Sequence, residues 1–172
     1  MSKDAPDPSN APVPREARVA IVAARFNEEI VKALIDGCLA RLAELGANPG
    51  LVEMHRVPGA FELPLAAKLL AETGRFAAVI CLGCVIRGDT PHFDYVAGSC
   101  AHGIAQAAME TRLPIIFGVL TTDTQEQAWQ RAGRDSAGAA GQGHDHGHAG
   151  RRAADAAAEM IALLRQIAAN RK

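Results

Sequence analysis

A nearly unbroken apolar run, Val79–Cys84, restricts the possible folds of this chain more than any other feature. Consecutive apolar positions are typical of a strand buried on both faces, as in a parallel sheet that helices cover on either side. Strand patterns occur at 18–24, 51–57, 76–85 and 114–120. Helical patterns alternate with them at 28–45, at 61–72, from Pro91 onward, at 124–133 and at 151–169. We therefore predict an α/β three-layer sandwich, a four-stranded parallel sheet with helices on both faces.

Two of the predicted helices show which side they bury. The first has an apolar stripe at helical spacing, formed by Val31, Leu34, Ile35, Cys38, Leu42 and Leu45. The last is predicted to turn these residues inward: Ala157, Met160, Ile161, Leu164 and Ile167. Hydrophobic residues make up 49% of the chain but aromatic residues only 4%. The core is therefore expected to consist of Ala, Val, Ile and Leu.

The length of 172 residues suits one domain with a substantial core. Residues 1–17 are polar and rich in proline, which predicts a disordered arm before a single domain at 18–172, with a Gly/His-rich loop at 134–150. A formal net charge of −1 argues against nucleic-acid or acidic-membrane partners. Without a membrane-spanning run or signal-peptide core, we expect a cytoplasmic protein with buried, reduced thiols. These thiols belong to Cys38, Cys81, Cys84 and Cys100.

Open parallel sheets bind ligands beyond the carboxyl ends of their strands. The segments in that place are Arg25–Asn27, Pro58–Glu62, Cys84–His92 and Phe117–Asp123. In the third segment, Asp89 or Thr90 is predicted to cap a helix that has Pro91 at its first position. Backbone amides and the helix dipole then favour a phosphate group, and His92 beside it has the chemistry to transfer protons near neutral pH.

Each candidate side chain also has a plain structural interpretation. Phe26 either stacks on a flat heterocycle or covers the end of the sheet. Glu62 either accepts hydrogen bonds from ligand hydroxyls or interacts favourably with the dipole of the helix that follows it. Arg131 either binds phosphate or interacts with the dipole at the carboxyl end of its helix. His92 is otherwise a surface histidine. Two interpretations are open for the Gly-rich loop: a transition metal is held by His144, Asp145, His146 and His148, or one of these histidines reaches a bound anion.

Taken in order, these segments resemble the lumazine synthase family. The resemblance runs from about Arg18 to the carboxyl end and rests on Arg25–Asn27, Val57–Pro64, Leu82–Val96, Phe117–Thr124 and Arg131–Gly133. It implies a flavodoxin-like fold and a transferase of riboflavin biosynthesis that needs no cofactor. The implied reaction condenses 5-amino-6-ribitylaminouracil with 3,4-dihydroxy-2-butanone 4-phosphate to 6,7-dimethyl-8-ribityllumazine, releasing water and phosphate.

The resemblance also implies a role for each matching residue. Phe26 stacks on the pyrimidine, and the ring and ribityl chain are held by Ala60, Phe61, Glu62, Cys84, Val85 and Ile86. The phosphate is bound by Asp89, Thr90 and Arg131. His92 donates and accepts protons, and Phe117 approaches from a neighbouring subunit. The four lysines lie outside all these segments, which argues against a lysine Schiff base.

One departure from the common bacterial pattern concerns the loop after Gly133. That pattern carries a phosphate-binding lysine there, whereas this loop is longer and contains no lysine. Some fungal members carry a His-x-His-Gly-like loop instead, which His144–Gly147 resembles. The resemblance therefore predicts that His144 or His146, or failing these Arg151, takes the place of the lysine.

The family forms homopentamers with active sites between subunits, and some pentamers build icosahedral shells. The long loop is expected to crowd contacts between pentamers, which predicts a free pentamer or a pair of pentamers. The resemblance further implies a functional link to riboflavin synthase. Three other interpretations are a non-catalytic flavin- or lumazine-binding relative, a metal-handling protein, and an archaeal-type riboflavin synthase on a related fold.

Overall fold

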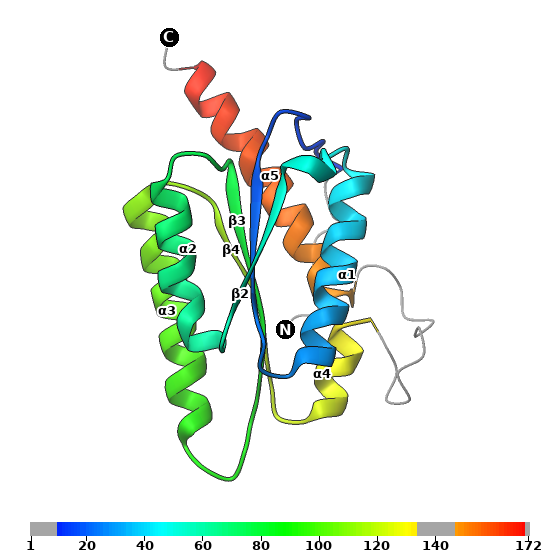
Figure 1. Ribbon diagram of the computed structural model, residues 1–172, viewed down its shortest axis with the longest axis vertical. Helices are drawn as coiled ribbons and strands as arrows, with labels where there is room; N and C mark the ends of the chain where they lie inside the picture. The colour runs from blue at the N-terminus through cyan, green and yellow to red at the C-terminus, as the bar shows by residue number, and fades with distance from the viewer. Residues whose placement is uncertain (1–9, 134–146, 171–172) are drawn as a thin grey trace.

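The computed structural model describes residues 10–133 and 147–170, and a parallel sheet lies at their centre (Figure 1). The sheet has four strands in the order β2-β1-β3-β4. The strands are β1 Val19–Ala24, β2 Val52–Val57, β3 Ala78–Ile86 and β4 Ile115–Thr122. β3 is buried from Ala78 to Cys84, as its apolar sequence predicts, and both of its neighbours run parallel to it.

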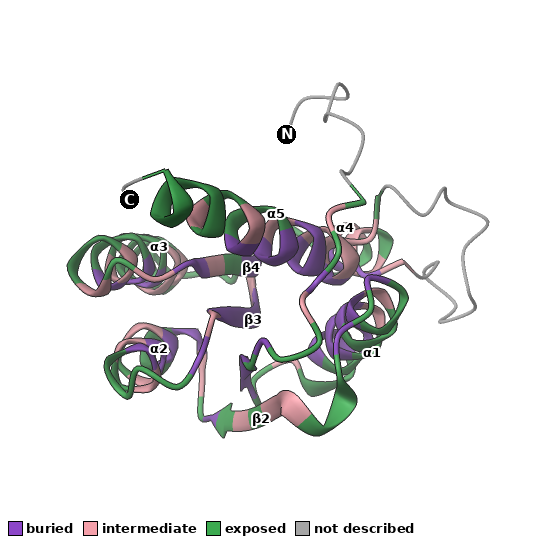
Figure 2. Ribbon diagram, turned by 90° about the horizontal axis from the view of Figure 1, so that it is seen from above, coloured by how far each residue is buried: buried purple, intermediate pink, exposed green. Residues whose placement is uncertain are grey.

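Helices cover both faces of this sheet. α2 and α3 pack on one face, and α1, α4 and α5 pack on the other (Figure 2). The α-helices are α1 Glu28–Glu44, α2 Leu63–Glu72, α3 His92–Thr111, α4 Gln125–Arg131 and α5 Ala149–Ala169. Single 3-10 turns are η1 Pro49–Leu51 and η2 Ala60–Glu62. The predicted three-layer, flavodoxin-like fold is confirmed. Within the described ranges, no helix is long and apolar enough to cross a membrane.

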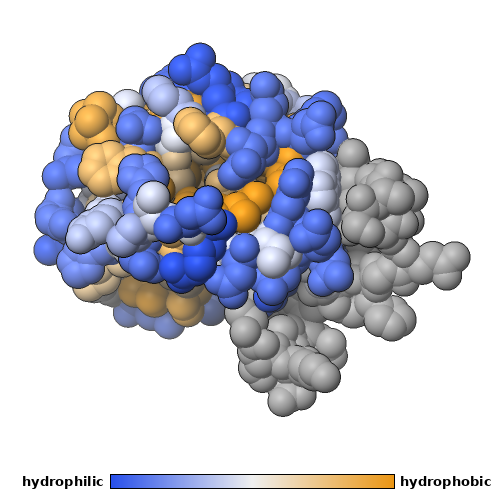
Figure 3. Space-filling view, turned by 90° about the horizontal axis from the view of Figure 1, so that it is seen from below, coloured by the Kyte–Doolittle hydropathy of each residue, from blue (hydrophilic) through white to orange (hydrophobic). Residues whose placement is uncertain are grey.

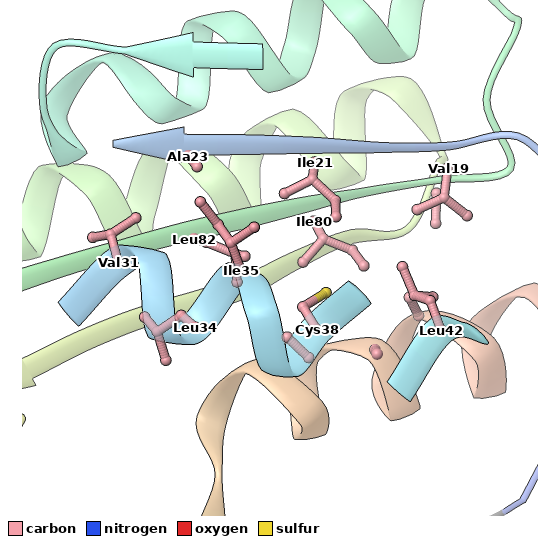
Figure 4. Packing of buried hydrophobic residues seen from close by; sticks show 14 of the residues in the cluster. Val19, Ile21, Ala23, Val31, Leu34, Ile35, Cys38, Leu42, Ile80 and Leu82 are labelled. Atoms are coloured by element: carbon pink, nitrogen blue, oxygen red, sulfur yellow. The ribbon is translucent and has the colours of Figure 1, made fainter. Parts of the chain in front are cut away.

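The core on the α1 side is almost entirely aliphatic (Figure 4). The predicted stripe of α1 is buried, and Leu34 and Cys38 are fully shielded from solvent. The stripe faces residues of β1 and β3, among them Ile21, Ile80 and Leu82. This packing fixes the amino end of α1 over the strands whose carboxyl ends carry the candidate site.

The stripe predicted for α5 is only partly correct. Ala157 and Ile161 are buried, but Met160 and Ile167 are exposed. The carboxyl end of α5, which includes Ile167, runs past the end of the sheet and has no strand to pack against there (Figure 1). The side of α5 that does meet the core is lined with alanines, which lets this helix approach α1 closely.

Residues 10–17, which we expected to be disordered, pack against the domain, while residues 1–9 lie outside the described residues. Val13 and Ala17 are buried, and Val13 N donates a hydrogen bond to Leu45 O at 2.8 Å. Prolines exclude a helix or an inner strand here, but an extended segment still buries its apolar side chains against the end of α1. The ordered domain therefore begins before Arg18.

A cluster of charges joins this segment to α1 and α5. The buried carboxylate of Asp155 accepts a hydrogen bond from Arg41 Nε at 2.7 Å. Arg41 also donates to Asn10 Oδ1 at 2.9 Å and to Glu44 Oε2 at 3.0 Å. Glu44 accepts a further bond from Arg151 Nη2 at 2.6 Å. The guanidinium groups of Arg151, which has the larger effect, and of Arg41 lower the pKa of Glu44 to about 2. The charge of Asp155 is thus paired where it is buried, as a stable fold requires.

α1 and α5 approach each other closely at Gly150. A Cβ atom built there would lie 3.0 Å from Leu34 Cα and closer still to the Leu34 carbonyl group. Gly150→Ala is therefore expected to destabilise the fold by about 1–3 kcal/mol through overpacking. Gly98→Ala, in an exposed part of α3 with open space around it, is expected to stabilise by about 0.5–1 kcal/mol. Urea denaturation of both variants checks this, and equal midpoints for the two variants would contradict the close packing at Gly150.

Candidate active site

The candidate site lies on a step in the carboxyl edge of the sheet. Ala23 of β1 pairs with Leu82 of β3, and β1 ends at the next residue. Cys84, Val85 and Ile86 therefore extend beyond β1 and are paired only with β4. The connections from β1 and β3 leave this edge toward opposite faces of the sheet, which makes it the switch point where open α/β sheets bind ligands.

The turn after β1 places Phe26 over this step. Phe26 N donates to Pro58 O at 3.2 Å, and its ring is 74% exposed. Asn27 adopts a left-handed conformation with φ 56°. Asn27 occupies the capping position of α1, but its side chain does not cap the helix, because Asn27 Nδ2 donates to Cys84 O at 2.9 Å. This bond ties the turn to the projecting end of β3.

The turn after β2 forms a second wall. Gly59 N donates to Glu62 Oε2 at 2.8 Å, which closes the single turn η2 ahead of α2. Ala60 is buried beneath this turn, whereas the Phe61 side chain is 59% exposed. One carboxylate oxygen of Glu62 is therefore engaged in a structural contact at this helix start.

The third wall is the turn from β3 into α3. We predicted that Asp89 or Thr90 caps this helix, but α3 starts at His92 with Pro91 at the capping position and no side-chain cap. Proline cannot accept at its side chain, and Asp94 N closes the first turn onto Pro91 O at 3.0 Å. His92 is the first residue of α3, and it is exposed to solvent. Asp94 pairs with Arg87 and is therefore no hydrogen-bond partner that orients His92.

The three walls enclose a cavity of about 720 Å³. Figure 3 views this edge and shows apolar side chains in a surround of hydrophilic ones. Of the residues that we predicted, the cavity is lined by Phe26, Ala60, Phe61, Glu62, Cys84, Val85, Ile86, Thr90 and His92. Sequence analysis missed Phe93, Tyr95 and Val96, which also line it. Tyr95 and Val96 lie three and four residues after His92, so helical spacing alone could have indicated them.

Two predicted residues lie away from this cavity. Phe117 is near the start of β4, paired with Cys81, and so about 16 Å from the carboxyl end of the strand. Arg131 is on α4, which packs on the face of the sheet opposite to α2 and α3. Its Nη1 donates to Gln127 O at 3.1 Å. Asp89 is in the β3–α3 turn but does not line the cavity. Of the remaining candidates, His144 and His146 lie outside the described residues.

The chemistry of the described walls is that of hydrogen bonding, stacking and proton transfer. Burial raises the pKa of the Cys84 thiol to about 12, so this side chain is a poor nucleophile at neutral pH. Lys32 and Lys68 are in ion pairs with Asp36 and Glu110 on helices away from the cavity. Imidazole is the side chain best suited to proton transfer near neutral pH, and His92 brings an imidazole to the cavity.

Metal binding gains no support from the described residues, which contain no cluster of three or more potential ligands. His148, which we considered as a metal ligand, accepts a hydrogen bond from Gly150 N at Nδ1, at 3.1 Å, and so caps α5. Its ring packs in the space left by Gly37 and Gly133. Arg151, the last candidate to replace a lysine, is paired with Glu44.

An apolar cavity at the switch point of an open parallel sheet defines an α/β protein that binds a small molecule. The profile of the family described as 6,7-dimethyl-8-ribityllumazine synthase matches residues 16–165. A protein of that name from Syntrophus aciditrophicus is 52% identical over 147 residues, which is 86% of this chain and 89% of the relative. Proteins of the same name from Protochlamydia amoebophila and Thermus thermophilus are 47% and 48% identical to this chain. The two matches cover 88% and 87% of this chain and 83% and 89% of the relatives.

The chain belongs to the 6,7-dimethyl-8-ribityllumazine synthase family. It is accordingly an enzyme of the transferase class. The resemblance in the five sequence segments is thereby confirmed as a family relationship.

The Asn27 hydrogen bond is expected to matter both to stability and to the cavity wall. Asn27→Ala loses the bond to Cys84 O and puts alanine at φ 56°, so it should destabilise by about 1–3 kcal/mol. Asn27→Gly tolerates that backbone conformation and loses only the bond, which should cost about 1 kcal/mol. Urea denaturation of the two variants measures the difference. Wild-type stability in Asn27→Ala would show that the turn does not depend on this residue.

Proposed function

We propose that this protein condenses 5-amino-6-ribitylaminouracil with 3,4-dihydroxy-2-butanone 4-phosphate to form 6,7-dimethyl-8-ribityllumazine, with release of water and phosphate. Family membership supports this reaction, and the names of the relatives specify its product. The observation that carries the proposal is that Phe26 and His92 line one cavity at the switch point of the sheet. This is the penultimate step of riboflavin biosynthesis, and we place it in the cytoplasm, with a functional link to riboflavin synthase.

The aromatic and apolar walls suit the pyrimidine. In our proposal, the ring of Phe26 stacks on the heterocycle, and the projecting backbone of Cys84–Ile86 lies along its edge. Phe61 and the free oxygen of Glu62 hold the ribityl chain, since Glu62 uses its other oxygen to accept from Gly59 N. A charged Glu62 is a strong acceptor for hydroxyl groups. This arrangement orients the amine toward the second substrate.

The start of α3 suits the phosphorylated substrate. First-turn amide groups and the positive end of the helix dipole favour a phosphate group, and Thr90 adds a hydroxyl donor in the cavity. We propose that this phosphate binds beside Asp89 and Thr90. His92 then transfers the protons that imine formation, phosphate elimination and ring closure require. Holding the two substrates together supplies most of the rate enhancement.

The remaining two residues are proposed to come from a neighbouring subunit. Phe117 is exposed on the edge strand β4, and Arg131 is on the far face of the sheet, so neither reaches the cavity of its own chain. In a homopentamer, or a pair of pentamers, the adjacent chain supplies Phe117 to the pyrimidine and Arg131 to the phosphate. We propose that His144 or His146 assists Arg131 in place of a lysine.

Turnover by the purified protein tests the proposed reaction directly. Both substrates are mixed with the protein, and the lumazine product is followed by its absorbance and fluorescence against a control without protein. We expect a rate well above the spontaneous condensation, and a large loss of rate in His92→Ala, about 10²-fold or more. A folded protein that binds the pyrimidine without any acceleration would contradict the proposal and favour a non-catalytic lumazine-binding relative.

Mixed oligomers test whether the active site is shared. His92→Ala and Arg131→Ala chains are each expected to be nearly inactive alone. After unfolding and refolding together, random assembly should restore about a quarter of the sites to an intact pair of residues. The matched control mixes His92→Ala with Phe26→Ala chains, which damage the same cavity and should restore nothing. Recovery in neither mixture would show that Arg131 acts within its own chain or not at all.

A further inference from the structure

One arginine, Arg87, joins three segments at the carboxyl edge of the sheet. It directly follows β3, and its backbone N donates to Thr122 O at 2.9 Å, which continues the ladder between β3 and β4. The exposed turn at 88–91 comes next, followed by His92 at the start of α3. The backbone of Arg87 is thus fixed on the sheet, immediately before the turn that we propose binds phosphate.

The Arg87 side chain reaches over this turn to its far end. Arg87 Nη2 donates to Asp94 Oδ1 at 3.2 Å, while Nη1 lies 3.5 Å from Asp94 Oδ2, a two-pronged contact with the first turn of α3. Arg87 Nε donates to Asp123 Oδ1 at 3.0 Å, directly after β4. The guanidinium carbon also lies 4.1 Å from the centre of the Phe93 ring. One planar cation therefore contacts both residues that follow His92 and the end of β4.

These contacts contribute little to global stability. The side chains of Arg87, Asp94 and Asp123 are 44%, 63% and 69% exposed, and ion pairs at such exposure are weak. Their consequence is local, because Arg87 and Asp94 close the turn at 88–91 at its two ends. These contacts connect the residue before the turn to the first turn of α3, which begins with His92.

We propose that Arg87 is a positioning residue that holds the 88–91 turn and the first turn of α3 in the geometry needed for phosphate binding and for proton transfer by His92. This inference rests on the proposed function, since it assigns a task to the same site. Arg87 itself does not line the cavity, so it acts through Asp94 and Phe93. Small misplacements of reacting groups cost large factors in rate, which is why such a clamp matters to a condensation.

The planar guanidinium group is essential to this task. A lysine ammonium has no fork of donors for a carboxylate, and it stacks less well on an aromatic ring. Arg87→Lys should therefore keep one ion pair and lose the combined contact with Asp94, Asp123 and Phe93. Arg87→Met keeps an unbranched apolar stem and removes all charged contacts.

A matched control exists at the other end of β3. Arg75 lies 4.9 Å from the centre of the Phe76 ring and pairs with Glu53, so it makes the same two kinds of contact far from the cavity. We would compare Arg87→Met, Arg87→Lys and Arg75→Met in the full-length protein. The measurements are kcat and KM for each substrate, thermal unfolding, and hydrogen exchange of the peptide that covers 88–96.

In Arg87→Met we expect KM for the phosphorylated substrate to rise about 10-fold and kcat to fall by a similar factor, with KM for the pyrimidine changed less than about 2-fold. Arg87→Lys should lie between this variant and the wild type. The 88–96 peptide should exchange faster in Arg87→Met, with the unfolding temperature nearly unchanged. Arg75→Met should match the wild type in kinetics and in exchange of that peptide.

Unchanged exchange and unchanged KM in Arg87→Met would overturn the inference. So would equal losses for both substrates together with a lowered unfolding temperature, since these indicate a general structural role. Hydrogen exchange does not depend on catalytic turnover, so a failure of the positioning role of Arg87 can be distinguished from a failure of the proposed condensation reaction. Faster exchange in Arg87→Met, in a protein whose wild type does not form lumazine, would refute the proposed function and leave Arg87 as the clamp of the turn.

Discussion

β1 and β3 end at different points along the carboxyl edge of the sheet, and this difference determines where the cavity lies. β3 continues past the end of β1 while remaining hydrogen-bonded to β4, so one side of its carboxyl end is free of strand pairing. The Asn27 side chain donates to Cys84 O at this unpaired edge, and the turns after β1, β2 and β3 surround the same step. If β1 and β3 ended at the same level, these turns would come together without a step between them.

Local sequence patterns predicted most of this arrangement. The apolar run of β3 and the stripe of α1 are set by burial, and burial can be inferred from residue type alone. Phe26 and His92 line one cavity because a parallel topology brings the ends of non-consecutive strands to one edge. By contrast, Arg131 lies away from the cavity of its own chain, as does Phe117, which the resemblance had assigned to a neighbouring subunit's cavity. Sequence order indicates the edge or face on which a residue lies within its own chain, but it does not indicate contacts with another chain.

The departures from the sequence patterns have a common physical cause, which is a contact that depends on residues distant in sequence. Asn27 has a side chain suited to helix capping, but the carbonyl group of Cys84 offers a tertiary acceptor that no local pattern shows. Ile167 fits an inward stripe, but the helix outruns the sheet that would bury it. Val13 lies in a proline-rich stretch, yet an extended segment can still cover the end of a helix. In each case the deciding partner is distant in sequence.

The two arginines that flank β3 and stack on phenylalanine rings show how position in a fold gives one interaction two different consequences. Arg75 and Arg87 each lie over a neighbouring phenylalanine ring and each pair with a carboxylate, and in both cases the exposed ion pairs contribute little to stability. At the amino end of β3 the contact joins segments that carry no cavity residues. At the carboxyl end it spans the turn that leads into α3, where a small shift would move His92. Both contacts involve exposed groups, so the consequence that we propose for Arg87 follows from what the adjoining backbone carries.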